Sequence, residues 1–216
     1  MYKLWVFDLD GTLVDSARTV TDILNEKRSE LGLPGVDVSA LVPWLSLGGE
    51  QLVAQALELP LASAAEHVLD FRCRYLERRT PKESVYPGVN ELLGALAERN
   101  KRIAVCTNKP RNLAEKVLAE VGLDRWVEFT CAGGDLPVRK PHVETLMSCL
   151  RRFAVSSSET LLVGDSTVDH RLASAAGVKF AFFQKGYDDG VSICSGDISI
   201  SSHLQLKSML SEGVLQ

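Results

Sequence analysis

Two pairs of aspartates in this sequence follow short apolar runs, a position from which carboxylates can do chemistry. Asp8 and Asp10 end the first apolar run, and Asp165 and Asp169 follow a later one. In the first pair, one carboxylate can attack a phosphoryl group while the other serves as a general acid or base. The second pair offers the oxygen ligands that Mg²⁺ prefers. Taken alone, each pair also fits an ordinary turn or helix N-terminus.

Two further segments carry polar groups in comparable positions. Thr107 and Asn108 end another apolar run, where a hydroxyl and backbone N–H groups can hold phosphate oxygens. Lys140 precedes Pro141 and a predicted helix, and its charge can offset two anions brought close together. The simpler alternatives are a helix N-cap for Thr107 or Asn108 and a surface basic pair for Lys140. Together, however, the four segments supply what phosphoryl transfer requires: a nucleophile, a metal site and donors to the phosphate.

The elements that must position these residues alternate between strand and helix. Strands are predicted at 4–9, 102–106, 127–131, 160–163, 178–183 and 198–200, and helices between them at 89–99, 111–121, 142–153, 168–176 and 204–210. Alternation of this kind predicts a parallel sheet with helices on both faces. Ligands of such sheets bind beyond the carboxyl ends of the strands, which is where the four polar segments lie.

A long segment after the first strand has a different pattern. Residues 16–31 and 37–79 show apolar positions at helical spacing and nothing typical of a strand. We therefore expect an α/β fold, a doubly wound parallel-sheet core with a small all-helical cap inserted after the first strand. The core is predicted to comprise residues 1–16 and 85–216, and the cap residues 17–84.

Composition narrows the function classes. The 216 residues are 45% hydrophobic and 24% charged with a formal net charge of −4, which favours a globular protein over a nucleic-acid binder. The short basic cluster Arg72-Cys73-Arg74 is interpreted as a solvated helix face. Five cysteines without a C-x-x-C pair suggest reduced thiols and a cytoplasmic location. No apolar run approaches the roughly 18 residues of a membrane span. The sequence does not distinguish a monomer from a homodimer.

The four segments, in this order, resemble the motifs of the haloacid dehalogenase superfamily, and within it the phosphoglycolate phosphatase-like branch. The first motif corresponds to Asp8-Leu9-Asp10-Gly11-Thr12-Leu13-Val14-Asp15-Ser16, and the second to Thr107-Asn108-Lys109-Pro110. Gly133-Gly134-Asp135 with Arg139-Lys140-Pro141 is similar to the third motif. Gly164-Asp165-Ser166 with Asp169 is similar to the fourth. The resemblance covers almost the whole chain.

The resemblance implies a Mg²⁺-dependent phosphatase that hydrolyses a small phosphate monoester, phosphoglycolate-like, through an aspartyl-phosphate. In that scheme Asp8 is the nucleophile and Asp10 the general acid/base, and Lys140 orients Asp8 and the phosphoryl group. Thr107 and Asn108 hold the phosphate. The metal would be ligated by Asp8, Asp165 and the backbone carbonyl of Asp10, with Asp169 in support. The expected partner is a small phosphorylated metabolite.

The resemblance leaves other activities open. Dehalogenases of the superfamily lack the second aspartate of the first motif, so Asp10 favours phosphoryl chemistry. A phosphotransferase or sugar-phosphate mutase is the alternative. It is disfavoured because mutases carry a histidine early after the first motif, whereas the histidines here are His67, His142, His170 and His203. A non-catalytic role is also possible on this fold, but the acidic and lysine positions are intact.

The cap segment departs from the family. Phosphoglycolate phosphatases tend to have a basic residue shortly before a glycine pair, but here Pro43-Trp44-Leu45-Ser46-Leu47 precedes Gly48-Gly49 and residues 33–71 contain no lysine or arginine. A carboxylate on the substrate would therefore have no partner in this stretch. Trp44 is either a core residue or a contact for a less polar leaving group. The physiological substrate is not determined by the sequence.

Overall fold

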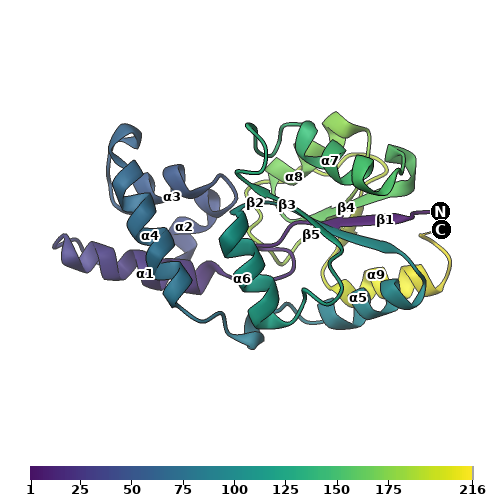
Figure 1. Ribbon diagram of the computed structural model, residues 1–216, viewed down its shortest axis with the longest axis horizontal. Coiled ribbons are helices and arrows are strands. Elements are labelled where there is room, and N and C mark those ends of the chain that lie inside the picture. Colours follow the sequence, from purple (N-terminus) through teal and green to yellow (C-terminus); the bar gives the residue numbers. More distant parts are fainter. Residues whose placement is uncertain (216) are drawn as a thin grey trace.

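The computed structural model describes residues 1–215 and contains a six-stranded parallel sheet (Figure 1). The strand order is β3-β2-β1-β4-β5-β6, and every strand pair is parallel. The strands are β1 Leu4–Phe7, β2 Arg102–Pro110, β3 Phe129–Gly133, β4 Thr160–Gly164, β5 Lys179–Phe183 and β6 Ile198–Ile200. Strands β2 and β3 are added on one side of β1, and strands β4, β5 and β6 on the other. The strand order therefore reverses at β1, which is the position where ligands of doubly wound folds bind.

Helices cover both faces of the sheet. One face packs against α5 (Val89–Glu98), α6 (Arg111–Val121) and α9 (His203–Ser211), and the other against α7 (Glu144–Phe153) and α8 (Thr167–Ala176). Alternate residues of β1 supply the two cores: Trp5 and Phe7 point to the first, Leu4 and Val6 to the second. Because both faces are buried, β1 is apolar throughout, as the sequence pattern predicted. The doubly wound parallel-sheet fold is confirmed.

A group of helices, here called the helical insert, lies between β1 and α5 and to one side of the sheet (Figure 1, left). It consists of α1 Ala17–Glu30, α2 Val38–Leu45, α3 Gly49–Ala56 and α4 Ala65–Glu77, with short 3₁₀ turns at Leu61–Ser63 and Lys82–Ser84. A third 3₁₀ turn, Ser157–Glu159, precedes β4. The helices of the insert fall inside the segment 17–84 predicted as a cap.

A buried arginine joins the helices of the insert. The Arg28 side chain on α1 is 2% exposed. It donates to the backbone carbonyls of Pro34 and Ala56 and to the Glu58 carboxylate. These bonds satisfy the guanidinium inside the insert, as a buried charge requires. They tie α1 to the end of α3.

Several element boundaries differ from the sequence prediction. The helical pattern of 37–79 is divided by Gly48, whose φ of +108° does not continue a helix, and by the turn at Leu61–Ser63. The third strand begins two residues later than predicted because Ala104 of β2 pairs with Phe129. The second strand extends to Pro110, past the predicted end at Cys106.

Candidate active site

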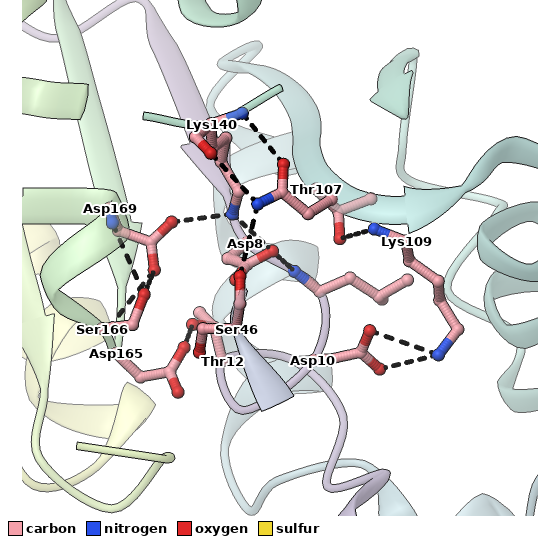
Figure 2. Close-up of polar contacts among 12 residues, drawn as sticks. Asp8, Asp10, Thr12, Ser46, Thr107, Lys109, Lys140, Asp165, Ser166 and Asp169 are labelled. Atoms are coloured by element: carbon pink, nitrogen blue, oxygen red, sulfur yellow. Dashed lines mark hydrogen bonds and ion pairs between the residues drawn. The ribbon is translucent and has the colours of Figure 1, made fainter. Parts of the chain in front are cut away.

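The predicted site residues converge at the carboxyl edge of the sheet (Figure 2). Asp8 follows β1, Thr107 lies near the end of β2, and Asp165 follows β4. These three strands are adjacent in the order β2-β1-β4 and parallel, so their carboxyl ends meet at one place. Residues more than 150 positions apart in the chain are thereby brought within hydrogen-bonding distance.

Lys140 lies between two buried carboxylates. Its Nζ is 2.8 Å from Asp8 Oδ1 and 2.7 Å from Asp169 Oδ1, and its side chain is 2% exposed. Burial acts to lower the pKa of Lys140, but Asp169 and Asp8 hold it above its ordinary value. The surface-pair alternative for Lys140 is therefore wrong. A buried ammonium between two carboxylates offsets their repulsion.

Asp8 has one oxygen engaged and one available. Oδ1 accepts hydrogen bonds from the Leu9 backbone N–H at 2.7 Å and from Lys140, whereas Oδ2 makes none within residues 1–215. Burial raises the pKa of Asp8 to about 7, with Lys140 lowering it and Asp169 raising it further. An opposing charge at this position would restore the carboxylate form.

Three carboxylates form a cluster suited to a hard cation. Asp8, Asp165 and Asp169 each offer an oxygen, and these oxygens lie within 4.8 Å of one another. Asp165 is fully buried, and burial together with the charges of Asp169 and Asp8 raises its pKa well above the ordinary value. The Thr12 hydroxyl and the Tyr187 backbone N–H fix the Asp165 carboxylate, at 2.6 and 2.7 Å. These oxygens are buried and held in fixed orientations, and their negative charge exceeds the positive charge of the nearby cations. Such a set of donors fits Mg²⁺.

Asp169 serves two partners at once. Its Oδ2 accepts from the hydroxyl of Ser166, the N-cap of α8, in a capping box, while Oδ1 takes Lys140. The helix N-terminus expected at this point is therefore present, and Asp169 also reaches the cluster. The close approach of the loops to Asp165 requires Gly11, at φ +81°, where a Cβ would lie 2.1 Å from Asp165 Oδ2.

Asp10 is engaged on the other side of the site. Its Oδ1 accepts from Ser16 Oγ at 2.5 Å and from Lys109 Nζ at 3.0 Å. The same ammonium lies 3.0 Å from the hydroxyl of Tyr75, which belongs to α4 of the helical insert. Burial acts to lower the pKa of Lys109, but Asp10 and Tyr75 raise it above its ordinary value. Ser16 is the N-cap residue of α1, but its hydroxyl donates to Asp10 and makes no cap bond.

The two residues expected to hold phosphate have different surroundings. The Thr107 hydroxyl accepts from the Lys109 backbone N–H at 3.2 Å, which leaves its proton to donate elsewhere. The Asn108 carboxamide accepts from the Lys140 N–H and donates to the carbonyls of Lys140 and Ser46. The N-cap alternative for these residues is wrong, since the N-cap of α6 is Pro110.

A cavity of about 70 Å³ connects these groups with the helical insert. The insert contributes Val20, Leu45, Ser46, Gly48, Gly49, Leu52, Phe71, Arg72 and Tyr75 to its wall. The interpretation of the basic cluster as a solvated helix face holds for Arg74, which pairs with Glu30 and Asp70. It is wrong for Arg72. Trp44 is not among the lining residues and packs against the hydrophobic core.

Sequence reasoning missed three groups at the site. Lys109 and Thr12 lie within the second and first motifs, but no function at the site was predicted for them. Tyr187 lies in the loop after β5, and no site residue was predicted there. The rule that ligands bind beyond the carboxyl ends of the strands also applies to β5. Its hydroxyl accepts from the backbone N–H groups of Ser16 and Ala17 at 2.7 and 2.8 Å. Tyr187 therefore links the carboxylate cluster, through its own N–H, to the start of α1.

The fold and the site together define the class of this protein. The parallel sheet carries the Asp8 carboxylate directly after β1, and Lys140 and the acidic cluster lie beside it. The family model described as Haloacid dehalogenase-like hydrolase matches residues 5–183. A phosphoglycolate phosphatase from Nitrosococcus oceani is 31% identical over 97% of this chain and 97% of its own length. One from Rhodospirillum rubrum is 37% identical over 87% of this chain and 81% of its own.

Solved structures agree with the sequence comparisons. The crystal structure of a predicted phosphoglycolate phosphatase from Haemophilus somnus superimposes with a TM-score of 0.85 at 25% identity, covering 97% of this chain and 98% of that one. A β-phosphoglucomutase from Clostridium difficile has a TM-score of 0.74 at 16% identity, a likeness of fold alone. The chain belongs to the haloacid dehalogenase-like hydrolase family. It is an enzyme of the phosphatase type.

Proposed function

We propose that this protein is a Mg²⁺-dependent phosphatase that hydrolyses a small phosphate monoester, phosphoglycolate-like, through an aspartyl-phosphate on Asp8. The observation that carries the proposal is the state of the Asp8 carboxylate. Lys140 and a backbone N–H hold one oxygen, and the other faces no donor within residues 1–215. A fixed carboxylate with a free oxygen can attack a phosphorus atom in line.

The reaction requires two steps with balanced proton transfer. In the first, Asp8 Oδ2 forms a bond to phosphorus as the ester P–O bond breaks, and Asp10 gives its proton to the leaving alkoxide. In the second, water attacks the phosphoryl group, the bond to Asp8 breaks, and Asp10 takes the proton of that water. Ser16 and Lys109 hold the Asp10 carboxylate in place between the steps.

The phosphoryl oxygens would be held by groups from β2 and the lysine. The Thr107 hydroxyl has its proton available, and Lys140 supplies a positive charge beside the nucleophile. The Asn108 carboxamide is used to hold the Lys140 backbone and Ser46, so we assign its phosphate contact to the backbone N–H. Asp8, Asp165 and the Asp10 carbonyl would ligate Mg²⁺, with Asp169 in support. When bound, the ion would neutralise charge on the phosphoryl oxygens.

The helical insert is assigned the role of a cap, with residues 17–84 as the cap and 1–16 and 85–216 as the core. Its support is the cavity, whose wall is built from both parts. A cap that closes over the site excludes water and selects the substrate. We further propose a cytoplasmic location, supported by five free thiols, and a monomer or homodimer. No helix in the described part of the chain is long and apolar enough to cross a bilayer.

Phosphate release from a panel of small esters, with Mg²⁺ and with chelator, tests the proposal. We expect metal-dependent release that the Asp8→Asn variant lacks while its circular dichroism spectrum is unchanged. Asp22→Asn, at an exposed position of α1, is the matched control and should retain activity. Turnover by Asp8→Asn would refute the mechanism. Transfer of the phosphoryl group to a second sugar hydroxyl, without free phosphate, would favour the mutase alternative.

A further inference from the structure

A histidine, a cysteine and an aspartate come together on the core, outside the cavity described above. His170 lies on α8, and Cys194 and Asp197 lie in the segment 184–197, which joins β5 to β6. Each residue offers one ligand atom, namely an imidazole nitrogen, a thiol sulfur or a carboxylate oxygen, and the three atoms lie within 4.8 Å of one another. The proposed phosphatase mechanism uses none of these side chains, so the cluster needs a separate explanation.

The cysteine and the aspartate stand at the two ends of one tight turn. The Asp197 backbone N–H donates to the Cys194 carbonyl at 3.0 Å, and the Cys194 N–H donates to Asp197 Oδ2 at 2.7 Å. Gly196, at φ +105°, allows the chain to turn here. Two cysteines with two residues between them are a common pair of zinc ligands. This turn has the same spacing, with a carboxylate in the second place.

The third group comes from a helix that precedes the turn in the chain. His170 Nε2 lies 3.1 Å from Asp197 Oδ2, and the two side chains are only 19% and 14% exposed. The imidazole packs on Phe180 of β5, with ring centroids 5.2 Å apart. Asp197 Oδ1 makes no hydrogen bond within residues 1–215, and Cys194 is an exposed free thiol. A carboxylate oxygen and a sulfur are therefore available beside a packed imidazole.

The separation of these atoms is close to that in a tetrahedral zinc site. With bonds of about 2.0–2.3 Å, the ligand atoms of such a site lie roughly 3.3–3.8 Å apart. The His170–Asp197 distance of 3.1 Å is near this range. The other separations, at most 4.8 Å, require shifts of about 1 Å. A fourth position is left for water, as in zinc sites with three protein ligands.

The donor set distinguishes this cluster from the acidic cluster of the active site. The acidic cluster offers oxygen alone, which suits Mg²⁺. Thiolate and imidazole ligands instead favour zinc and related divalent ions. The deprotonated side chains of Cys194 and Asp197 carry two negative charges. The Lys179 ammonium, 3.3 Å from where a Cβ of Gly196 would stand, offsets one of them.

The segment 184–197 also contacts the active site. It contains no helix or strand, and irregular segments of about 12–15 residues or more are uncommon in compact domains unless they have a function. Within it the Tyr187 N–H donates to Asp165 at 2.7 Å, and Asp189 accepts from the N–H and the hydroxyl of Thr167 at 2.6 and 2.7 Å. The histidine-containing cluster holds the same segment at its far end, next to β6.

We propose that His170, Cys194 and Asp197 form a binding site for a zinc-class divalent cation, which fastens the segment 184–197 to α8. Binding releases the thiol proton to solvent, because only the thiolate is a ligand. The site is separate from the proposed phosphatase chemistry and does not depend on it. The alternative is an ion pair between His170 and Asp197 that binds no metal.

Cobalt is the probe that distinguishes the two, because a Co²⁺–thiolate bond gives a charge-transfer absorption in the near ultraviolet that oxygen ligands do not give. The full chain, kept reduced and with excess Mg²⁺ to occupy the acidic cluster, is titrated with Co²⁺ and then with Zn²⁺. We expect the absorption to saturate near one equivalent of Co²⁺ and to disappear with one equivalent of Zn²⁺. Zinc should also raise the urea midpoint, since a ligand bound only by the folded state stabilises it.

Single substitutions identify the ligands. Cys194→Ser should abolish the absorption and lower the affinity for Zn²⁺ at least about 100-fold, since loss of a mere outer partner of a ligand typically costs about 10- to 100-fold. His170→Gln should lower the affinity by a similar factor. Cys73→Ser is the matched control, because Cys73 is the other exposed thiol and lies on α4 of the insert. It should leave the absorption and the affinity unchanged.

Three outcomes would overturn the inference. The first is absence of the absorption in the wild type. The second is an absorption that Cys194→Ser retains or that Cys73→Ser removes. The third is a zinc-dependent rise of the urea midpoint that is equal in the wild type and in Cys194→Ser, because the stabilising ion would then be bound elsewhere.

Discussion

A buried histidine at the start of α9 predicts a specific acid sensitivity. His203 is 0% exposed, and neither ring nitrogen has a hydrogen-bond partner within residues 1–215. The ring packs on Phe183, with centroids 4.4 Å apart, and faces Tyr86 at 6.4 Å. Burial lowers the pKa of His203 to about 4 from an ordinary value of 6.5, although the nearby backbone carbonyls of Thr12 and Pro87 act to raise it. The folded protein therefore holds this side chain neutral.

The sign and size of the effect follow from that difference. Below pH 6.5 the unfolded chain binds a proton that the folded chain does not, so the contribution of His203 is fully present above pH 6.5 and lost as the pH falls toward 4. Each unit of pKa difference corresponds to about 1.4 kcal/mol. The full loss is thus about 3 kcal/mol, and about 2 kcal/mol is lost by pH 5.

The assay is urea denaturation between pH 7.5 and 5 for wild type and His203→Leu. Leucine fills a similar apolar space and does not titrate. The free energy of unfolding of wild type, minus that of the variant, should fall by about 2 kcal/mol across this range. The difference is used because Asp8 and Asp165, whose pKa values are raised, change stability in the opposite direction.

The exposed His142 supplies the control, since His142→Gln should follow wild type at every pH. A pH-independent difference between wild type and His203→Leu would show that the folded protein accommodates the protonated ring. The reasoning from burial would then be wrong.

Three other changes have expected outcomes. Lys140→Met should lower kcat by about 10²- to 10³-fold in phosphate-release assays, because a fixed charge beside the phosphoryl group is lost; activity near the wild-type value would contradict its role. Gly11→Ala should weaken Mg²⁺ binding measured by calorimetry, because the new Cβ meets Asp165 and the φ of +81° is unfavourable for alanine; unchanged affinity would show that the loop adjusts. Arg28→Leu should lower the free energy of unfolding by about 2–4 kcal/mol in urea titrations, because buried carbonyls lose their donor; a change below about 0.5 kcal/mol would show that water replaces it.

The local sequence pattern was sufficient to predict the fold and the positions of the reacting carboxylates. Asp8 and Asp165 directly follow strands that are apolar because they are buried on both faces. A parallel sheet brings such strand ends together, so spacing and order predicted their neighbourhood. The boundaries of β2 and β3 were less accurate, because strand pairing determines where each ends.

Which side chains line the cavity depends on the tertiary structure. Arg72 and Arg74 are two residues apart in one basic cluster, yet the first lines the cavity and the second pairs with Glu30 on the surface. Their directions depend on how α4 is rotated against its neighbours, which the local charge pattern does not encode. Arg72 directly follows the stretch 33–71, which contains no lysine or arginine, and it is the residue that lines the cavity.

Short-range periodicity and motif order were sufficient to predict the fold class, the family and the groups available for phosphoryl chemistry. Which of these groups form pairs could not be predicted from local patterns. Lys109 is matched to Asp10 across 99 residues, and Tyr187 reaches Ser16 across 171. Pairing depends on distances between segments remote in the chain. The same dependence separates Lys109, which is paired with Asp10, from Arg72, which has no such partner within residues 1–215.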